Sequence, residues 1–300
     1  MTRPAIREEA AVPAFIRREQ FLAAGDDPNA QVVLMGAPLD VTTSFRPGTR
    51  FGPARIRAVS DGLEEFSPVL DRELADVPFY DAGDMDLAPG RVRESLSAIE
   101  EAVAAAVGRG QLPVVLGGEH LLTLGAVRGV LRHVPDLAVI QFDAHADLRD
   151  DYLGEKLSHA TVMRRVAELI GPGRLYQLGI RSGTADEFRF GSAQTNFYPL
   201  PLGGTMAELA ERAAAAVGSR PVYITLDIDV VDPGFAPGTG TPEPGGVTPG
   251  QLLQALYALS ELNVVGIDVV EVCPPQDVSD VTSVLAAKIV REALLCFGAR

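Results

Sequence analysis

The chain has 300 residues, of which 47% are hydrophobic and 22% charged, as in an ordinary globular protein. Its formal net charge of −14 comes from 40 acidic and 26 basic residues, so its surface repels nucleic-acid backbones and attracts small cations. The two cysteines argue against a disulfide framework, no apolar run is long enough to cross a membrane, and the N-terminal sequence MTRPAIREEAAVPAF lacks the apolar core of a secretory signal. We therefore expect a cytoplasmic protein that binds neither nucleic acid nor a membrane.

Short apolar and β-branched runs alternate with longer segments of helical periodicity, which is typical of an α/β fold with a parallel sheet. In chain order, the strands are expected at 31–36, 77–81, 112–116, 137–142, 175–180, 222–226 and 264–270, and the helices at about 92–107, 121–131, 159–170, 206–217, 249–262 and 281–297. Ser158 and the pair Thr248-Pro249 have the chemistry of helix N-termini.

No linker, repeat or low-complexity tract divides the chain, so we expect one domain over residues 1–300, with residues 1–29 as an N-terminal arm. Two long segments rich in Gly, Pro and Thr, at 38–53 and 232–248, interrupt the pattern. Loops of this length in a compact domain are usually functional or interfacial. The sequence leaves open whether segment 38–53 lines a pocket or a subunit contact.

Polar motifs follow three of the expected strands directly. They are G-G-E-H, F-D-A-H-A-D and L-D-I-D, and they carry His120, Asp143, His145, Asp147, Asp227 and Asp229. Ligands of an open α/β sheet bind beyond the carboxyl ends of its strands, and residues two apart on an extended chain share a face. We therefore expect these six side chains to converge at one edge of the sheet.

Four carboxylates and two imidazoles in one place repel each other unless cations neutralise them. This donor set suits Mn²⁺, with Zn²⁺ or Co²⁺ as alternatives, and six ligands serve two ions about 3.5–4 Å apart better than one. A lone D-x-D pair is common on surface loops and a lone histidine is usually structural. Three of the four histidines lie within the motifs, however, and a buried D-x-H-x-D without a metal is costly. The sequence therefore predicts a two-metal site.

With these motifs in place, the chain resembles the ureohydrolases, the arginase–agmatinase family of binuclear manganese enzymes. The resemblance runs in order through G-G-E-H, F-D-A-H-A-D, S-H-A-T, D-I-D-V-V-D-P, G-T-G-T-P-E and D-V-V-E-V, and covers roughly residues 30–298. The segment S-F-R-P-G-T-R-F-G-P-A-R-I-R at 44–57 is especially similar to bacterial agmatinases. The resemblance implies a three-layer α/β/α arginase-like fold with a mostly parallel sheet, two Mn²⁺ per subunit, and trimers or hexamers.

The resemblance also implies roles for individual residues. His120 and Asp147 would bind one manganese, His145 and Asp229 the other, and Asp143 and Asp227 would bridge the two. His159, in S-H-A-T, matches the family's proton-handling histidine, and Glu271, in V-V-E-V, matches the glutamate that pairs with the substrate guanidinium. Alone, His159 would be interpreted as a helix-start residue and Glu271 as a surface carboxylate at a strand end. Glu119 and Ala146 depart from the family's usual residues, but neither position needs to contact a metal.

Together these roles predict that a hydroxide bridging the ions attacks the guanidinium carbon and releases urea and an amine. Arginases hold the amino-acid end of arginine with residues that are absent here, since Arg149 and Ser182 occupy their places. Agmatine is therefore the expected substrate, with putrescine as the amine.

Two further residues bear on the substrate. Arg149 is expected near the substrate and would favour a carboxylate tail, as in guanidinobutyrate, unless it pairs with Asp150 or Asp151 on the surface. Glu243, in G-T-G-T-P-E, either lines the pocket or ends a turn. The competing hypotheses are a guanidinobutyrase or another guanidino-compound hydrolase of the family, and a non-catalytic metal-binding relative.

Overall fold

The computed structural model describes residues 12–16, 19–200 and 204–298. Its centre is a sheet of nine strands in the order β1-β5-β2-β6-β11-β10-β7-β8-β9. Every neighbouring pair is parallel except β1 and β5, and a separate two-stranded hairpin is formed by β3 and β4. The strands are β1 (Phe15–Ile16), β2 (Val32–Ala37), β3 (Phe66–Ser67), β4 (Arg72–Glu73), β5 (Phe79–Met85), β6 (Leu112–Gly117), β7 (Ala138–Phe142), β8 (Leu175–Leu178), β9 (Asn196–Tyr198), β10 (Val222–Asp227) and β11 (Val264–Val270).

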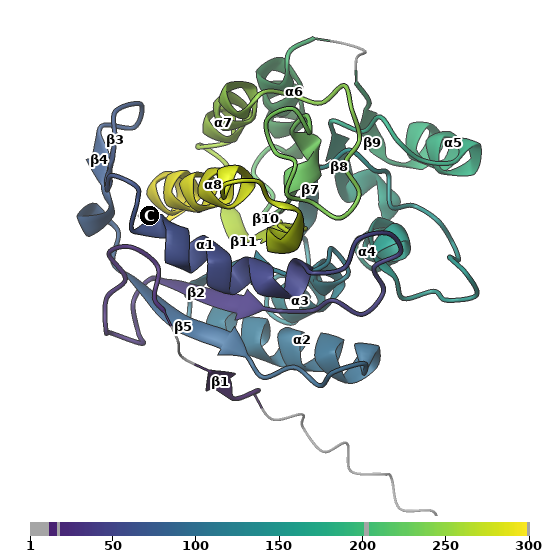
Figure 1. The fold of residues 1–300 in the computed structure, drawn as a ribbon. Helices are drawn as coiled ribbons and strands as arrows, with labels where there is room; N and C mark the ends of the chain where they lie inside the picture. The colour runs from purple at the N-terminus through teal and green to yellow at the C-terminus, as the bar shows by residue number, and fades with distance from the viewer. Residues whose placement is uncertain (1–11, 17–18, 201–203, 299–300) are drawn as a thin grey trace, which may run out of the picture.

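Helices cover both faces of this sheet (Figure 1). They are α1 (Gly52–Ser60), α2 (Val92–Gly108), α3 (Leu122–Leu131), α4 (Val162–Ile170), α5 (Ala185–Gln194), α6 (Met206–Val217), α7 (Pro249–Ala258) and α8 (Val281–Phe297). Alternate residues of a strand enter different cores: Val32 and Leu34 belong to the core that includes residues of α1, α6, α7 and α8, whereas Val33 and Met35 belong to the core that includes residues of α2, α3 and α4. This three-layer α/β/α architecture with a mostly parallel sheet confirms the predicted fold.

The expected elements are present, with local differences at their ends. The strand expected at 77–81 is β5 and extends to Met85, because Asp81 and Asp84 within it are neutralised by Arg57 of α1. The helix expected from His159 begins as a 3-10 turn, and α4 follows at Val162. Ser158 and Thr248 cap their helices as predicted. Helices α1 and α5 and the short strands β1, β3, β4 and β9 were not expected.

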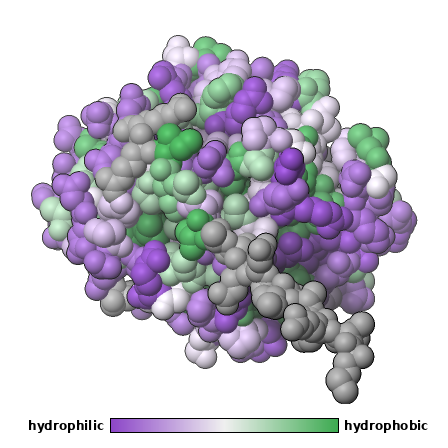
Figure 2. All heavy atoms as spheres, turned by 90° about the horizontal axis from the view of Figure 1, so that it is seen from below, coloured by the Kyte–Doolittle hydropathy of each residue, from purple (hydrophilic) through white to green (hydrophobic). Residues whose placement is uncertain are grey.

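The described part of residues 1–29 packs along the outer edge of the sheet. Strand β1 pairs antiparallel with β5, and Phe21 is buried edge-on against Phe79. Figure 2 shows apolar side chains gathered on the face that carries β1, and a groove there is lined by Val12 and Phe15 together with residues of β2, β5 and α2. Strand β1 therefore covers part of an edge that would otherwise expose unpaired backbone. Within the described residues, no helix combines the length and apolar character needed to cross a bilayer.

Candidate metal centre and active site

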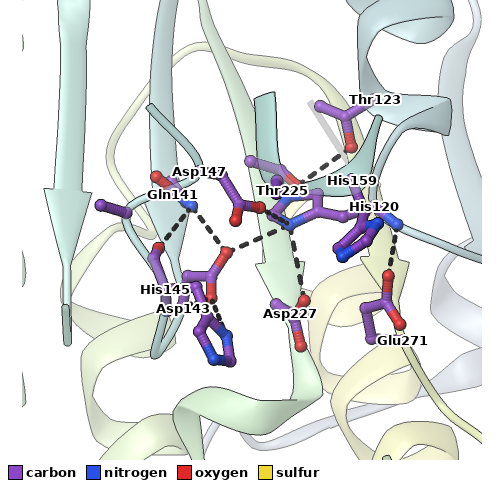
Figure 3. A network of polar contacts seen from close by, with 12 residues as sticks. His120, Thr123, Gln141, Asp143, His145, Asp147, His159, Thr225, Asp227 and Glu271 are labelled. Atoms are coloured by element: carbon purple, nitrogen blue, oxygen red, sulfur yellow. Dashed lines mark hydrogen bonds and ion pairs between the residues drawn. The ribbon is translucent and has the colours of Figure 1, made fainter. Parts of the chain in front are cut away.

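The candidate site lies at the carboxyl ends of four adjacent strands, β6, β11, β10 and β7. His120 follows β6 by three residues, Asp143 follows β7 directly, Asp227 is the last residue of β10, and Glu271 follows β11. Parallel strands bring these ends to one edge although the residues are up to 151 positions apart. Figure 3 shows His120, Asp143, Asp147 and Asp227 pointing toward one another.

Two groups of side chains meet at this edge and share one member. In the first, His120 Nδ1 lies 3.1 Å from Asp143 Oδ2, 3.2 Å from Asp147 Oδ2 and 3.4 Å from Asp227 Oδ2. In the second, His145 Nδ1 lies 2.9 Å from Asp229 Oδ2 and 3.7 Å from Asp143 Oδ1. All six residues identified from the motifs are thus brought together, and Asp143 offers one oxygen to each group.

The charges in this cluster are those of a centre that needs cations. Burial and the neighbouring charge of Asp143 raise the pKa of Asp147 to about 7. Burial alone would lower the pKa of His145, but the nearby carboxylate of Asp229 outweighs it and the pKa rises to about 12. Two atoms aimed into the cluster, His120 Nδ1 and Asp229 Oδ2, are buried and make no hydrogen bond among the described residues. Without cations the cluster must therefore hold protons, and its oxygen and nitrogen donors fit divalent metal ions.

A second layer of buried polar groups lies behind His120. Thr225 Oγ1 lies 2.9 Å from His120 Nε2 and 3.3 Å from Thr123 Oγ1, and Thr123 donates to Asp268 at 2.8 Å. A histidine whose far nitrogen is hydrogen-bonded in this way is held in one orientation with the other nitrogen free for an ion. Sequence reasoning missed this layer, although Thr225 and Asp268 stand out as polar residues inside otherwise apolar strands.

Glu271 lies beside the cluster and faces the same pocket, which has a volume of about 240 Å³. Its Oε1 accepts the backbone N–H of His120 at 2.7 Å, and burial raises its pKa to about 8. Its backbone has a left-handed conformation (φ 64°), as does that of Asp147 (φ 53°). Such strain in residues other than glycine is typical of functional sites.

His159 also lines this pocket and is held by the 38–53 segment. Its Nδ1 lies 3.3 Å from Thr42 Oγ1 and its Nε2 lies 3.3 Å from Ser44 Oγ. Thr42 in turn donates to the buried carboxylate of Glu119, which also accepts the backbone N–H groups of Val41 and Thr42. Desolvation lowers the pKa of His159 to about 4. Part of the 38–53 segment thus lines the pocket, which the sequence left open.

Arg149 lines the outer part of the pocket, and its surface pairing with Asp150 or Asp151 is not observed. Its Nε lies 3.5 Å from Glu187 Oε2, and its guanidinium lies 5.0 Å from the ring centre of Tyr152. Asp150 instead pairs with Arg165 at 2.7 Å. Sequence reasoning missed Tyr152 and Glu187, although T-A-D-E at 184–187 is a capping-box signal that places Glu187 at a helix start.

The side chain of Glu243 is not among the groups that line this pocket; Thr241 of the same motif is. The backbone carbonyl of Glu243 accepts from Arg181 Nη2 at 2.6 Å, and the same Nη2 donates to the carbonyl of Asp229 at 2.7 Å. The substrate-binding role of Glu243 therefore stays a prediction, because its side chain does not line the pocket. Arg181, which had been given no role, fastens the 232–248 loop to the ion cluster.

Comparison with known proteins places this geometry in a family. The model of the arginase family matches residues 30–296. An agmatinase of Bacillus subtilis is 50% identical over 89% of this chain and 92% of that protein, and a guanidinobutyrase of Pseudomonas aeruginosa is 37% identical over 87% and 84%. Among solved structures, the agmatine ureohydrolase of Thermoplasma volcanium superposes with a TM-score of 0.86 at 33% identity, covering 94% of both chains. The chain belongs to the arginase family.

Proposed function

We propose that this protein hydrolyses agmatine to putrescine and urea with two Mn²⁺ ions per subunit. The observation that carries the proposal is the pair of ion-binding groups that share Asp143 beneath a pocket bordered by Glu271. The agmatinase of Bacillus subtilis, 50% identical to this chain, supports the choice of substrate. The residues at the places where arginases bind an amino-acid head, Arg149 and Ser182, support a substrate without that head.

His120 and Asp147 would hold one ion, His145 and Asp229 the other, and Asp143 and Asp227 both. Two such ions supply Lewis acidity that activates a water molecule and stabilises negative charge. The distances support this division for the residues that hold one ion each, because His120 Nδ1 faces Asp147, whereas His145 Nδ1 faces Asp229. Asp227 lies beside His120, and its part in holding the second ion rests on the family resemblance. Among the described residues that line the pocket, Arg149 is the only lysine or arginine, and its Nε lies 3.5 Å from Glu187 Oε2.

Glu271 would bind the guanidinium of the substrate. Its carboxylate lines the pocket, and the His120 N–H at 2.7 Å anchors one of its two oxygens. Burial raises the pKa of Glu271 to about 8 and so favours its neutral form. A cationic guanidinium that binds beside it has the opposite effect and favours the charged carboxylate. A charge-assisted pair of this kind also orients the planar guanidinium for attack on its carbon.

His159 would transfer the proton that the departing amine needs. The bond from the guanidinium carbon to the alkyl-chain nitrogen breaks, the water oxygen ends on urea, and the nitrogen leaves as the amine after taking a proton. With a pKa of about 4, His159 is neutral at neutral pH. It would therefore pass on a proton taken from the attacking water during turnover rather than store one beforehand.

The outer pocket bears on the choice between agmatine and guanidinobutyrate. The positive charge of Arg149 favours a carboxylate tail, and a guanidinobutyrase is 37% identical to this chain. Glu187 lies 3.5 Å from Arg149 and offsets that charge, and the net charge of −14 attracts a dication. These observations, with the higher identity to agmatinases, favour agmatine and leave guanidinobutyrate as the second candidate.

The setting of this activity forms part of the proposal. We infer one domain over residues 1–300 with an N-terminal arm, a cytoplasmic location, a role in putrescine biosynthesis, and assembly into a homohexamer or trimer. Each rests on the family resemblance and on the composition, including the two cysteines. Size-exclusion chromatography with light scattering would give the number of subunits directly.

The decisive experiment measures urea released from agmatine, guanidinobutyrate and arginine by the Mn²⁺-loaded protein, alongside the variants Asp227→Ala and His159→Asn. We expect the wild type to turn over agmatine. Asp227→Ala should lose both its bound metal and its activity, and His159→Asn should keep its metal content but have a lower kcat. Faster turnover of guanidinobutyrate than of agmatine would make guanidinobutyrate the substrate instead of agmatine. Two bound ions without urea release from any compound would indicate a non-catalytic relative.

A further inference from the structure

A chain of buried neutral side chains leads to Asp143, the carboxylate that both ion-binding groups share. Gln141 Nε2 donates to Asp143 Oδ2 at 2.6 Å and to the His145 carbonyl at 3.3 Å. Gln177 Nε2 donates to Gln141 Oε1 at 2.7 Å and to the Ala146 carbonyl at 2.9 Å. Figure 3 shows Gln141 beside Asp143, on the side away from Asp227.

The backbone explains why these groups meet. Gln141 and Asp143 are two residues apart at the end of β7, so their side chains lie on the same face. Gln177 is the register partner of Gln141 on the neighbouring strand β8. Both glutamines are fully buried, and polar side chains in such positions must find hydrogen bonds within the protein.

The chemistry of the partners fixes the direction of the chain. The His145 and Ala146 carbonyls and the Asp143 carboxylate only accept hydrogen bonds, so each amide must turn its nitrogen toward them. A reversed Gln141 amide would place oxygen against the Asp143 carboxylate, and a reversed Gln177 amide would do the same at the Ala146 carbonyl. The Gln141 N–H is therefore committed to Asp143.

We propose that Gln141 is a positioning residue that holds Asp143 in the orientation in which its two oxygens serve two different ions. Asp143 Oδ1 is anchored by the His145 N–H at 2.6 Å and Oδ2 by Gln141, so neither oxygen can rotate away. An amide orients the carboxylate without cancelling its charge, whereas a lysine or arginine would weaken its attraction for cations. The inference rests on the two-ion centre proposed above.

The chain offers a matched control in Gln111. It is also buried, its Nε2 donates to the carbonyls of Pro28 and Ala30, and its Oε1 accepts from Arg109, so it has the same hydrogen-bond inventory as Gln141. None of its partners belongs to the ion cluster. Replacing Gln111 by leucine therefore removes an equivalent buried amide without touching the metal centre.

The test compares full-length wild type, Gln141→Leu, Gln177→Leu and Gln111→Leu after removal of metal. Mn²⁺ binding is followed by calorimetry and by the rise in Tm that added Mn²⁺ produces, since a ligand stabilises the state that binds it. Loss of an outer hydrogen-bond partner of a metal ligand typically weakens binding about 10–100-fold. We expect this for Gln141→Leu, a smaller loss for Gln177→Leu, wild-type affinity for Gln111→Leu, and recovery of kcat in Gln141→Leu at high Mn²⁺.

Wild-type Mn²⁺ affinity in Gln141→Leu, or an equal loss in Gln111→Leu, would overturn this inference and leave the proposed function intact. A wild type that binds no Mn²⁺ and releases no urea would instead overturn the proposed function. If Gln141→Leu does not fold, Gln177→Leu decides the question, because it removes the support of Gln141 and leaves the amide itself in place.

Discussion

Replacing Arg181 with methionine tests whether a single side chain holds the 232–248 loop against the ion cluster. Its guanidinium donates to the carbonyls of Asp229 at 2.7 Å and Glu243 at 2.6 Å, with longer contacts to Val230 and Pro244. Methionine keeps the apolar stem and removes every donor.

The size of the effect follows from the two shortest contacts. A hydrogen bond from a charged donor contributes about 1.5–3 kcal/mol, and because Arg181 is only half-buried we take the lower value for each. The free energy of unfolding should then fall by about 3 kcal/mol, which is roughly a hundredfold in the unfolding equilibrium. Mn²⁺ affinity should fall as well, because the backbone of Asp229 loses its anchor.

Urea unfolding of the metal-free protein measures the first effect, and Mn²⁺ calorimetry together with proteolysis of the 232–248 loop measures the second. Arg181→Lys is the control, since it keeps the charge but cannot reach several carbonyls at once with a planar fork of donors. A change within about 0.5 kcal/mol in Arg181→Met, with normal Mn²⁺ affinity, would refute the reasoning.

Two further predictions concern charge. Burial opposes protonation of His120, but the carboxylates of Asp143, Asp147 and Asp227 around its Nδ1 outweigh burial and raise its pKa well above the usual value. At pH 7 the metal-free cluster therefore holds protons that ions must displace, so Mn²⁺ affinity should rise with pH. Binding heats that do not depend on the buffer would contradict this. Arg57→Met removes the ion-pair partner of the buried Asp81, which keeps only the backbone N–H groups of Phe21 and Gly83 as donors. The free energy of unfolding measured with urea should fall by about 3–5 kcal/mol, and an unchanged value would contradict this.

The fold and the ion cluster were predictable because their signals are local. Apolar runs marked the long strands, and His120, Asp143 and Asp227 follow them at positions where a parallel sheet must bring them together. The family match over residues 30–296 agrees with the resemblance expected over 30–298. Helix α5 was missed because its apolar residues form no clear stripe, although its capping box was visible at Thr184.

The supporting groups were not predictable, because their partners lie on other strands. Gln141 is oriented by a hydrogen bond from Gln177 on the neighbouring strand, and Thr225 is paired with His120, which is 105 residues away in the sequence. Strand β5 was expected to end at Asp81 for the same reason, since the partner that neutralises Asp84 further along the strand is on α1. For Arg149 the sequence left a surface pair with Asp150 or Asp151 as the alternative to a place near the substrate, because its partner Glu187 lies on a helix that the pattern did not reveal.

The order of the strands has a consequence for how the protein is made. All six proposed ion ligands lie between His120 and Asp229, yet β11, the last strand of the chain, is inserted between β6 and β10. In the finished sheet the ends of β6 and β10 lie two strand spacings apart, about 10 Å, and until β11 is inserted no strand holds them at that separation. The group around His120 is therefore complete only once residues 264–270 have joined the sheet, whereas β7 and β10 can pair before that and bring Asp143 and Asp229 together.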